Sequence, residues 1–333
     1  MTATRRFGSP LIDPRGNTGQ MDSRALPAHL ADSSTTIQWA KSTLPELVPE
    51  TGSAPKDSKD VFSVGQLVEG KYEIRGVLGA GGMGQVFEAK DVGLNRLVAL
   101  KAAWPHVGAD PLRREAQVLA AFRHPGLVTV HALGSDAGVE FLVMERLSGT
   151  TLADFLIRKA REPVALKEAV GILVALADAL APLHASGLAH ADVKPANIML
   201  SPGDRMVLLD FGIARIEQLR SGAQRITGSP HYMAPEAIRG AVGVGAAHLV
   251  DLYAVGVIAF VMLTGEAPFD HPNPIELMVL HLHEEAPRVS SKRPEVPPAL
   301  DNLVADLMAK DPADRTPDVE VLRAELRRIQ ARL

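Results

Sequence analysis

Four side chains that suit phosphoryl transfer stand close together in the second half of the chain. Asp192, Lys194 and Asn197 fall within the eight residues that start at His190, and Asp210 opens an Asp-Phe-Gly triplet thirteen residues after Asn197. Two carboxylates and a carboxamide at this spacing can bind magnesium ions and a phosphate chain beside a hydroxyl group. One carboxylate would accept the hydroxyl proton, and the other would ligate the metal together with the amide. The spacing therefore indicates a phosphoryl-transfer site.

A glycine-rich loop and a lysine upstream suit the same chemistry. The loop, residues 78–86, places glycines at Gly79, Gly81 and Gly84. Glycines let backbone N–H groups approach phosphate oxygens closely. Dinucleotide-binding folds use the same glycine spacing, but there the loop leads into a helix, whereas β-forming residues follow this loop. Lys101 lies in an apolar run, where a lysine needs a specific partner.

The first part of the chain must position the loop and Lys101, and its pattern is mostly β. Short apolar runs separated by turn residues predict strands over residues 72–78, 85–90, 97–102, 127–133 and 139–145. One helix is predicted between them. It starts at Asp110-Pro111, an N-cap residue followed by proline, and Glu115 shares a face with Leu112 and Leu119.

The second part shows helical spacing and must position the catalytic residues. Leu249–Leu263 is almost wholly apolar, which predicts a buried helix. A Pro-Gly-Asp turn predicts a hairpin of residues 198–200 and 206–209. Further helices are expected over residues 152–159, 165–185, 274–284, 300–309 and 318–333. The predicted fold class is α+β, with a small β-rich N-lobe that has one helix and a larger, mainly α C-lobe.

The composition excludes several classes of protein. The chain has 333 residues, a formal net charge of −4 and no cysteine. The small net charge gives no reason to expect binding to nucleic acid or to anionic membranes, and disulfides and cysteine metal sites are excluded. Leu249–Leu263 is shorter than the roughly 20 residues that span a bilayer, and it contains Asp251, so we expect no membrane span.

The start of the chain differs from the rest. Ser, Thr, Pro and Gly are frequent there, and Phe7 and Trp39 are the only aromatic residues before residue 60. So little apolar area cannot offset the entropy of ordering, which predicts a disordered leader over residues 1–62. A docking or autophosphorylation tail is the alternative interpretation. The N-lobe is expected over residues 63–147 and the C-lobe over residues 148–333.

The order of these motifs resembles the eukaryotic-type (Hanks-type) bacterial serine/threonine protein kinase family over about residues 65–330. The resemblance implies a bilobal protein-kinase-like fold that uses ATP and Mg²⁺, with Mn²⁺ as a substitute. It implies that Asp192 accepts the substrate hydroxyl proton and that Lys194 neutralises the γ-phosphate. Asn197 and Asp210 would be the metal ligands.

The resemblance also implies an ATP-binding set. Lys101 would pair with the α- and β-phosphates and be oriented by Glu115, and the adenine edge would meet the backbone that follows Met144. The implied ATP-binding residues are Leu78, Gly79, Gly81, Gly84, Val86, Ala99, Lys101, Glu115, Met144, Glu145, Leu147 and Met199.

Residues 228–236 resemble the family's substrate-receiving segment, which ends in Ala-Pro-Glu. By the same resemblance, Glu236 should form a buried ion pair with Arg315, and Asp251 should anchor the backbone of the catalytic loop. His190 is expected to be a packed structural residue rather than a catalyst.

One position departs from the family pattern. The arginine that usually precedes the catalytic aspartate commonly pairs with a phosphorylated activation-loop residue, and it is Ala191 here. We hypothesise that activity depends less on phosphorylation of Ser221 or Thr227, unless Arg113, Arg114, Arg215 or Arg225 binds the phosphate instead.

Three functions are weighed. The favoured one is a serine/threonine protein kinase that also phosphorylates itself, with ATP and proteins carrying Ser or Thr acceptors as partners. A pseudokinase that acts as a binding or scaffold module is the alternative, and Ala191 is its only support. A small-molecule kinase of related fold is disfavoured, because residues 229–236 and Arg315 suit a docked peptide.

We further expect a cytoplasmic enzyme that ends within its last helix, and a transient homodimer. Delivery elsewhere by the leader stays open.

Overall fold

The structure, a computed structural model, describes residues 60–81, 84–105, 110–160, 162–212 and 229–333. The predicted leader therefore lies outside the described residues except for residues 60–62, and so do Ser221 and Thr227. Those three leader residues contact the sheet instead of standing apart from it. Phe62 is 3% exposed, and its ring meets the rings of Phe87 and Phe141.

The N-lobe is built on a six-stranded antiparallel sheet in the order β1-β2-β3-β4-β6-β5. Strand β4 is buried from residue 98 to residue 103, as expected for a central strand. Val86 pairs with Gly79 on one side and with Lys101 on the other, so the glycine loop and the lysine belong to neighbouring strands. The strands are β1 (Leu67–Val68), β2 (Tyr72–Ala80), β3 (Gly84–Asp91), β4 (Arg96–Ala103), β5 (Val130–Asp136) and β6 (Val139–Glu145).

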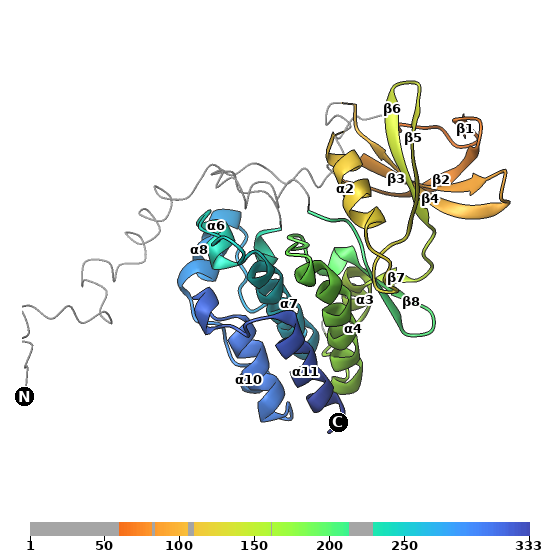
Figure 1. Ribbon diagram of the computed structural model, residues 1–333. Coiled ribbons are helices and arrows are strands. Elements are labelled where there is room, and N and C mark those ends of the chain that lie inside the picture. The colour runs from red at the N-terminus through yellow and green to blue at the C-terminus, as the bar shows by residue number, and fades with distance from the viewer. Residues whose placement is uncertain (1–59, 82–83, 106–109, 161, 213–228) are drawn as a thin grey trace, which may run out of the picture. The chain divides into compact units, whose positions relative to one another are not determined.

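Helix α2 (Asp110–Ala120) lies beside this sheet (Figure 1). Its buried residues are Leu112, Glu115, Ala116 and Leu119, which follow the spacing of one helix face. The carboxylate of Glu115 therefore lies on the face that packs inward, and this explains why it can meet Lys101.

The C-lobe is mainly helical, and four helices run side by side in Figure 1: α4 (Leu166–Ala185), α7 (His248–Thr264), α10 (Pro298–Leu307) and α11 (Val319–Gln330). Helix α7 is buried along nearly its whole length, as its unbroken apolar sequence predicts, and it ends at Gly265 with a left-handed φ of 77°. A small sheet of β7 (Thr150–Thr151), β8 (Ile198–Ser201) and β9 (Arg205–Leu208) flanks the catalytic turn η2 (Pro195–Asn197).

The remaining C-lobe elements are α3 (Leu152–Arg158), η3 (Pro230–Tyr232), α6 (Pro235–Ile238), α8 (Pro274–His283), α9 (Val289–Lys292) and η4 (Pro312–Asp314). Within the described ranges, no helix combines the length and the apolar character that crossing a bilayer requires.

The predicted α+β fold with a β-rich N-lobe and a helical C-lobe is confirmed. The predicted five-stranded N-lobe was wrong by one strand, because β1 has only two residues and shows no alternation. Strand β7 was missed for the same reason. Strand β5 begins at Val130 rather than at Leu127, since Leu127 instead forms a bridge with Leu208 of β9.

Candidate active site

Three charged side chains from distant parts of the chain meet in one cluster. The Lys101 ammonium on β4 donates to both carboxylate oxygens of Glu115 on α2, at 2.9 and 2.8 Å, and to Oδ1 of Asp210 at 2.8 Å. Lys101 is 7% exposed and Glu115 is 4% exposed. The structure thus forms the predicted Lys101–Glu115 pair, and it also brings Asp210 to the lysine.

The two carboxylates respond differently to this cluster: burial, together with the nearby Asp210, raises the pKa of Glu115 in spite of Lys101, whereas the pKa of Asp210 is lowered. Burial opposes ionisation of Asp210, but the Lys101 ammonium and its hydrogen bond outweigh burial and lower the pKa of Asp210. Burial likewise opposes the charge on Lys101, and the two carboxylates overcome it and raise the pKa of Lys101. Lys101 and Asp210 are therefore both charged at neutral pH.

The catalytic turn places Asp192, Lys194 and Asn197 side by side. The Asn197 Nδ2 group donates to the backbone carbonyl and to Oδ2 of Asp192, each at 2.9 Å. The Lys194 ammonium lies 3.2 Å from the same Oδ2 atom. With its N–H groups held by Asp192, the Asn197 amide leaves its oxygen as the atom that suits a metal.

His190 is a packed structural residue, as predicted. Its Nε2–H donates to the Leu209 carbonyl at 2.9 Å, and its Nδ1 accepts the Asp192 backbone N–H at 3.2 Å. The ring lies 4.7 Å from the Phe211 ring, between centroids, and burial lowers the pKa of His190. A neutral imidazole with both nitrogens occupied cannot exchange protons with a substrate, but it fixes the two acidic segments relative to each other.

Asp251 on α7 holds the backbone of the catalytic loop that starts at His190. Its carboxylate accepts the backbone N–H groups of His190 at 2.7 Å and Ala191 at 2.8 Å, and it also accepts Nε2–H of His184 at 2.9 Å. Burial opposes the charge on Asp251, but these donors outweigh burial and lower its pKa. Asp251 thus makes the backbone contacts with the catalytic loop that the sequence predicted for it. His184 was missed, because its contact with Asp251 joins residues that lie far apart in the sequence.

Two residues of the site have an unusual backbone conformation. Ala191 and Asp210 adopt left-handed φ angles of 63° and 48°, which non-glycine residues rarely do. A Cβ on Gly212 would lie 3.1 Å from both the Asp192 Cβ and the His190 carbonyl oxygen. A side chain at position 212 would therefore require the segments of Asp210 and Asp192 to move apart slightly.

The predicted adenine-side residues come together only in part. Ala99, Met144 and Leu147 are buried in one apolar cluster, and the half-buried Val86 and Met199 pack against it. Leu78 is 43% exposed and does not join them. The Glu145 side chain turns away to Arg205, so any adenine contact at Glu145 would be made by its backbone.

The glycine loop is held by a residue that the sequence did not single out. The Trp104 indole N–H donates to the Gly81 carbonyl at 2.6 Å, and Gly81 N–H donates to the Gly84 carbonyl at 2.9 Å. The tip of the loop, residues 82–83, lies outside the described residues. A lone tryptophan beyond β4 carries no motif, so only the three-dimensional contact reveals this role.

The substrate-like segment ends in a buried ion pair. Two guanidinium nitrogens of Arg315 donate to the two Glu236 carboxylate oxygens at 2.6 and 2.7 Å, and Arg315 also donates to the carbonyls of Ala309 and Leu249. The Arg315 side chain is 0% exposed and that of Glu236 is 7% exposed. The predicted pair is therefore formed. Of the candidates for binding a phosphate in place of the missing arginine, Arg113 and Arg114 lie on α2, whereas Arg215 and Arg225 lie outside the described residues.

The donor set also allows a test of whether a magnesium ion fits. Asn197 and Asp210 offer oxygen atoms, which magnesium prefers, and half of the Asp210 side chain, 47%, is exposed. The described residues contain no group of three acidic, histidine or cysteine side chains placed to hold a metal alone. Two oxygen donors fit a magnesium ion whose other ligands are phosphate oxygens and water.

Comparisons with known proteins agree with this geometry. The family model described as "Protein kinase domain" matches residues 72–326. The chain is 33% identical over 271 residues to the serine/threonine-protein kinase PrkC of Bacillus subtilis, a match that covers 79% of this chain and 41% of PrkC. It is 37% identical over 254 residues to the serine/threonine-protein kinase PknD of Mycobacterium tuberculosis, which covers 74% of this chain and 38% of PknD. The chain thus spans about two fifths of the length of these relatives.

Among solved structures, the kinase domain of PknI from Mycobacterium tuberculosis superposes with a TM-score of 0.62 at 28% identity. That match covers 82% of this chain and 100% of the PknI domain. The similarity therefore extends over both the sheet and the helical part described above.

Proposed function

The chain belongs to the protein kinase domain family, and from this premise we propose that it transfers the γ-phosphoryl group of ATP to Ser and Thr hydroxyls of proteins, its own included. One observation carries the proposal. The Lys101–Glu115–Asp210 cluster and the Asp192–Asn197 pair are both formed, and this supports a site that binds phosphate groups beside a hydroxyl.

Each residue of the site has a distinct task in this reaction. Asp192 is positioned by Asn197 and accepts the proton of the attacking hydroxyl, while Lys194 beside it neutralises charge on the transferred phosphoryl group. Lys101, held by Glu115, pairs with the α- and β-phosphates. These groups bind and orient the reactants, and no covalent enzyme intermediate is needed.

Members of this family use ATP with a divalent metal. We propose Mg²⁺ as the metal here, held by Asn197 and Asp210, with Mn²⁺ as a substitute; when bound, it supplies positive charge next to the phosphate oxygens. Lys101 shares the Asp210 carboxylate, and the lowered pKa of Asp210 keeps that carboxylate deprotonated for a metal.

A protein substrate is favoured by residues 229–236 and their anchor. The Glu236–Arg315 pair supports a segment on which a peptide can lie, which a small-molecule kinase does not need. Lys194, two residues after Asp192, is typical of serine/threonine rather than tyrosine specificity. The cytoplasmic location, the transient homodimer and the effect of Ala191 stay predictions.

An Asp192→Asn variant tests the proposed reaction. We expect kcat for phosphate transfer to a protein substrate to fall by about 10²- to 10⁴-fold, because asparagine cannot accept the hydroxyl proton. The KM for ATP should change little, since Asp192 makes no predicted contact with the base or the α- and β-phosphates. Transfer is measured from γ-labelled ATP with Mg²⁺ present.

Asp204→Asn is the matched control, because Asp204 lies in the β8–β9 turn with a φ of 56° that asparagine tolerates. It should keep full activity. Nucleotide binding without any turnover by the unaltered chain would contradict the proposal and favour the pseudokinase alternative.

A further inference from the structure

A hollow of about 530 Å³, called the α3 hollow below, lies between helix α3, the catalytic turn η2 and the C-terminal part of helix α7. Helix α3 packs against η2, and η3 packs against α7. The apolar side chains that line the hollow are Leu156 and Ile157 of α3, Pro195 of η2, Tyr232 of η3 and Val261 of α7. Segments that lie far apart in the sequence therefore build one apolar surface.

Two walls of the α3 hollow belong to the segments that would handle a protein substrate. Pro195 is three residues from Asp192, a stretch that spans at most about 11 Å. Tyr232 lies in residues 229–236, the segment on which a peptide is proposed to lie. A peptide whose hydroxyl group meets Asp192 would thus bring a side chain a few residues away to this hollow, which is continuous with the proposed active site.

The surface of the α3 hollow is almost uncharged. Ile157 is 75% exposed, and it stands beside the half-buried Leu156 and Val261. One exposed isoleucine alone is ordinary, but a hollow with several apolar walls is the usual form of a binding site. Burial raises the pKa of Tyr232 to about 12, so its hydroxyl stays neutral. Among the described residues of the lining, Glu162 is the one charged group.

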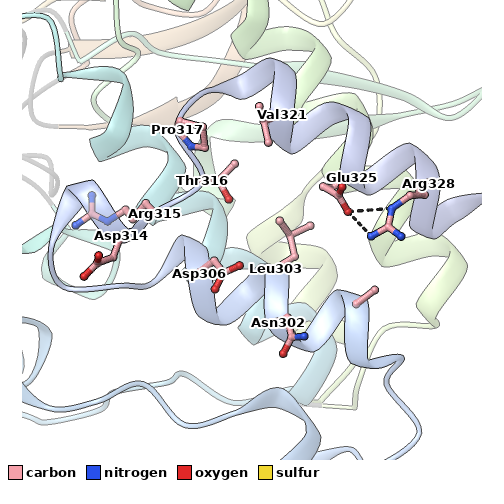
Figure 2. A pocket seen from close by; sticks show the side chains of 11 residues that line it. Asn302, Leu303, Asp306, Asp314, Arg315, Thr316, Pro317, Val321, Glu325 and Arg328 are labelled. Carbon is pink, nitrogen blue, oxygen red and sulfur yellow. Dashed lines mark hydrogen bonds and ion pairs between the residues drawn. The ribbon is translucent and has the colours of Figure 1, made fainter.

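Figure 2 shows another hollow of the C-lobe, between α10, the loop with η4 and helix α11. There Arg328 pairs with Glu325, as the dashed lines mark. None of its lining residues lies in η2 or in residues 229–236. Val321, which is labelled in Figure 2, is an exposed aliphatic residue on a helix like Ile157, and it therefore provides a control position.

We propose that the α3 hollow is a specificity subsite that takes a large apolar side chain of the protein substrate, within about four residues of the Ser or Thr acceptor. The proposal rests on the proposed kinase function and specifies its substrates. A leucine seated there shields itself, Leu156 and Ile157 from water. It should be favoured about tenfold or more over a charged residue at the same position.

Phosphate transfer to synthetic peptides tests the subsite. Each peptide carries one serine in a background of alanine and glycine, and a single leucine, arginine or aspartate that is moved along both sides of the serine. At one position we expect leucine to raise kcat/KM about tenfold over arginine and aspartate. Transfer with equal kcat/KM for all peptides, or a preference for arginine over leucine at every position, would overturn the subsite and leave the kinase proposal standing.

Two variants locate the preference in the α3 hollow. Ile157→Lys changes an exposed side chain, and it should remove most of the leucine preference and favour aspartate a few-fold at the same position. Val261→Thr keeps the size of the side chain but adds a hydroxyl, and it should weaken the preference several-fold. Val321→Lys is the matched control and should keep the preference. A leucine preference that survives both Ile157→Lys and Val261→Thr would overturn the proposal.

Peptide binding separates the subsite from catalysis. With ATP and Mg²⁺ present, the Asp192→Asn variant should bind a labelled leucine peptide several-fold more tightly than the aspartate peptide, as measured by fluorescence anisotropy. Adding Ile157→Lys should abolish this difference. If the unaltered chain transfers no phosphate but the binding difference is found, the kinase proposal fails and the subsite stands. Equal binding of the two peptides would overturn the subsite. Unfolding temperatures show whether each variant is folded.

Discussion

Lys101 holds the charge balance of the active site, because it is the cation that faces both Glu115 and Asp210 in the described part of the chain. Removing one member of a buried ion pair leaves the other charge without compensation. Glu115, with a side chain only 5% exposed, would be the residue left in that position. Stability and activity therefore both depend on the same ammonium group.

Lys101→Met should lower the free energy of unfolding by about 3–5 kcal/mol and abolish phosphate transfer. The double variant Lys101→Met/Glu115→Gln should recover part of the stability, since the buried carboxylate is gone, but none of the activity. Denaturant unfolding with an unchanged m-value, together with the transfer assay, checks both statements. A single variant as stable as the unaltered chain would show that Glu115 is not left as a buried charge.

Single residues were predictable wherever the chemistry lies in a short contiguous motif. Asp192, Asn197 and Asp210 are recognised by spacing alone. Trp104 and His184 act through contacts with Gly81 and Asp251, which are far from them in sequence, so no local pattern could reveal them. The exposure of the Leu78 side chain could not be predicted from the sequence either, because it depends on how the glycine loop lies on the sheet.

Helix α7 is the element that holds the catalytic loop, and it does so through Asp251. Because burial is outweighed by the donors from His184 and His190, the pKa of Asp251 is lower in the folded chain than the usual value of about 3.9. The unfolded chain therefore takes up this proton first as the pH falls. The stabilisation is complete above the usual pKa and is lost as the pH falls through the folded pKa.

Asp251→Asn should thus be clearly less stable than the unaltered chain at neutral pH, by about 3 kcal/mol, since bonds to a charged acceptor are replaced. The difference should begin to shrink below about pH 4, where the unfolded form of the unaltered chain takes up this proton, and should vanish once the pH has passed the lower folded pKa. Denaturant unfolding of both chains at several pH values measures this difference, and the other acidic groups cancel in it. A difference that stays constant down to acid pH would contradict the assigned role.

Arg315, in the loop before α11, forms an ion pair with Glu236 of helix α6. This ion pair gives a second prediction about how the elements of the C-lobe are held together. Arg315→Met leaves the Glu236 carboxylate buried and unpaired, which should cost about 3–5 kcal/mol of stability. The KM for a protein substrate should rise more than the KM for ATP, because Glu236 closes the substrate-like segment. Lys292→Met is the matched control. Its partner Glu266 is 56% exposed, so the loss should be about 0–1 kcal/mol.

Across the whole chain, the order of long elements was predictable from periodicity, whereas short pairings were not. Helix α7 and the strands β3 and β4 have enough residues to show their period. Strands β1 and β7 have two residues each and exist only because a partner strand pairs with them. The predicted boundary after residue 62 rested on composition, which cannot show that a single Phe62 side chain fills the core of the sheet.

A comparison of two shortened chains, 60–333 and 63–333, measures where the folded unit begins. Loss of Phe62 removes a buried ring from contact with Phe87 and Phe141, which should cost about 3–5 kcal/mol. Loss of Asp60 and Val61 also leaves the buried Gln85 side chain without its two partners, at about 1–3 kcal/mol more. Phe62→Ala in the longer chain should reproduce the first part of this loss. Equal denaturation midpoints for the two shortened chains would place the boundary at residue 63, as composition alone suggests, and would mean that Phe62 contributes nothing to the stability of the sheet.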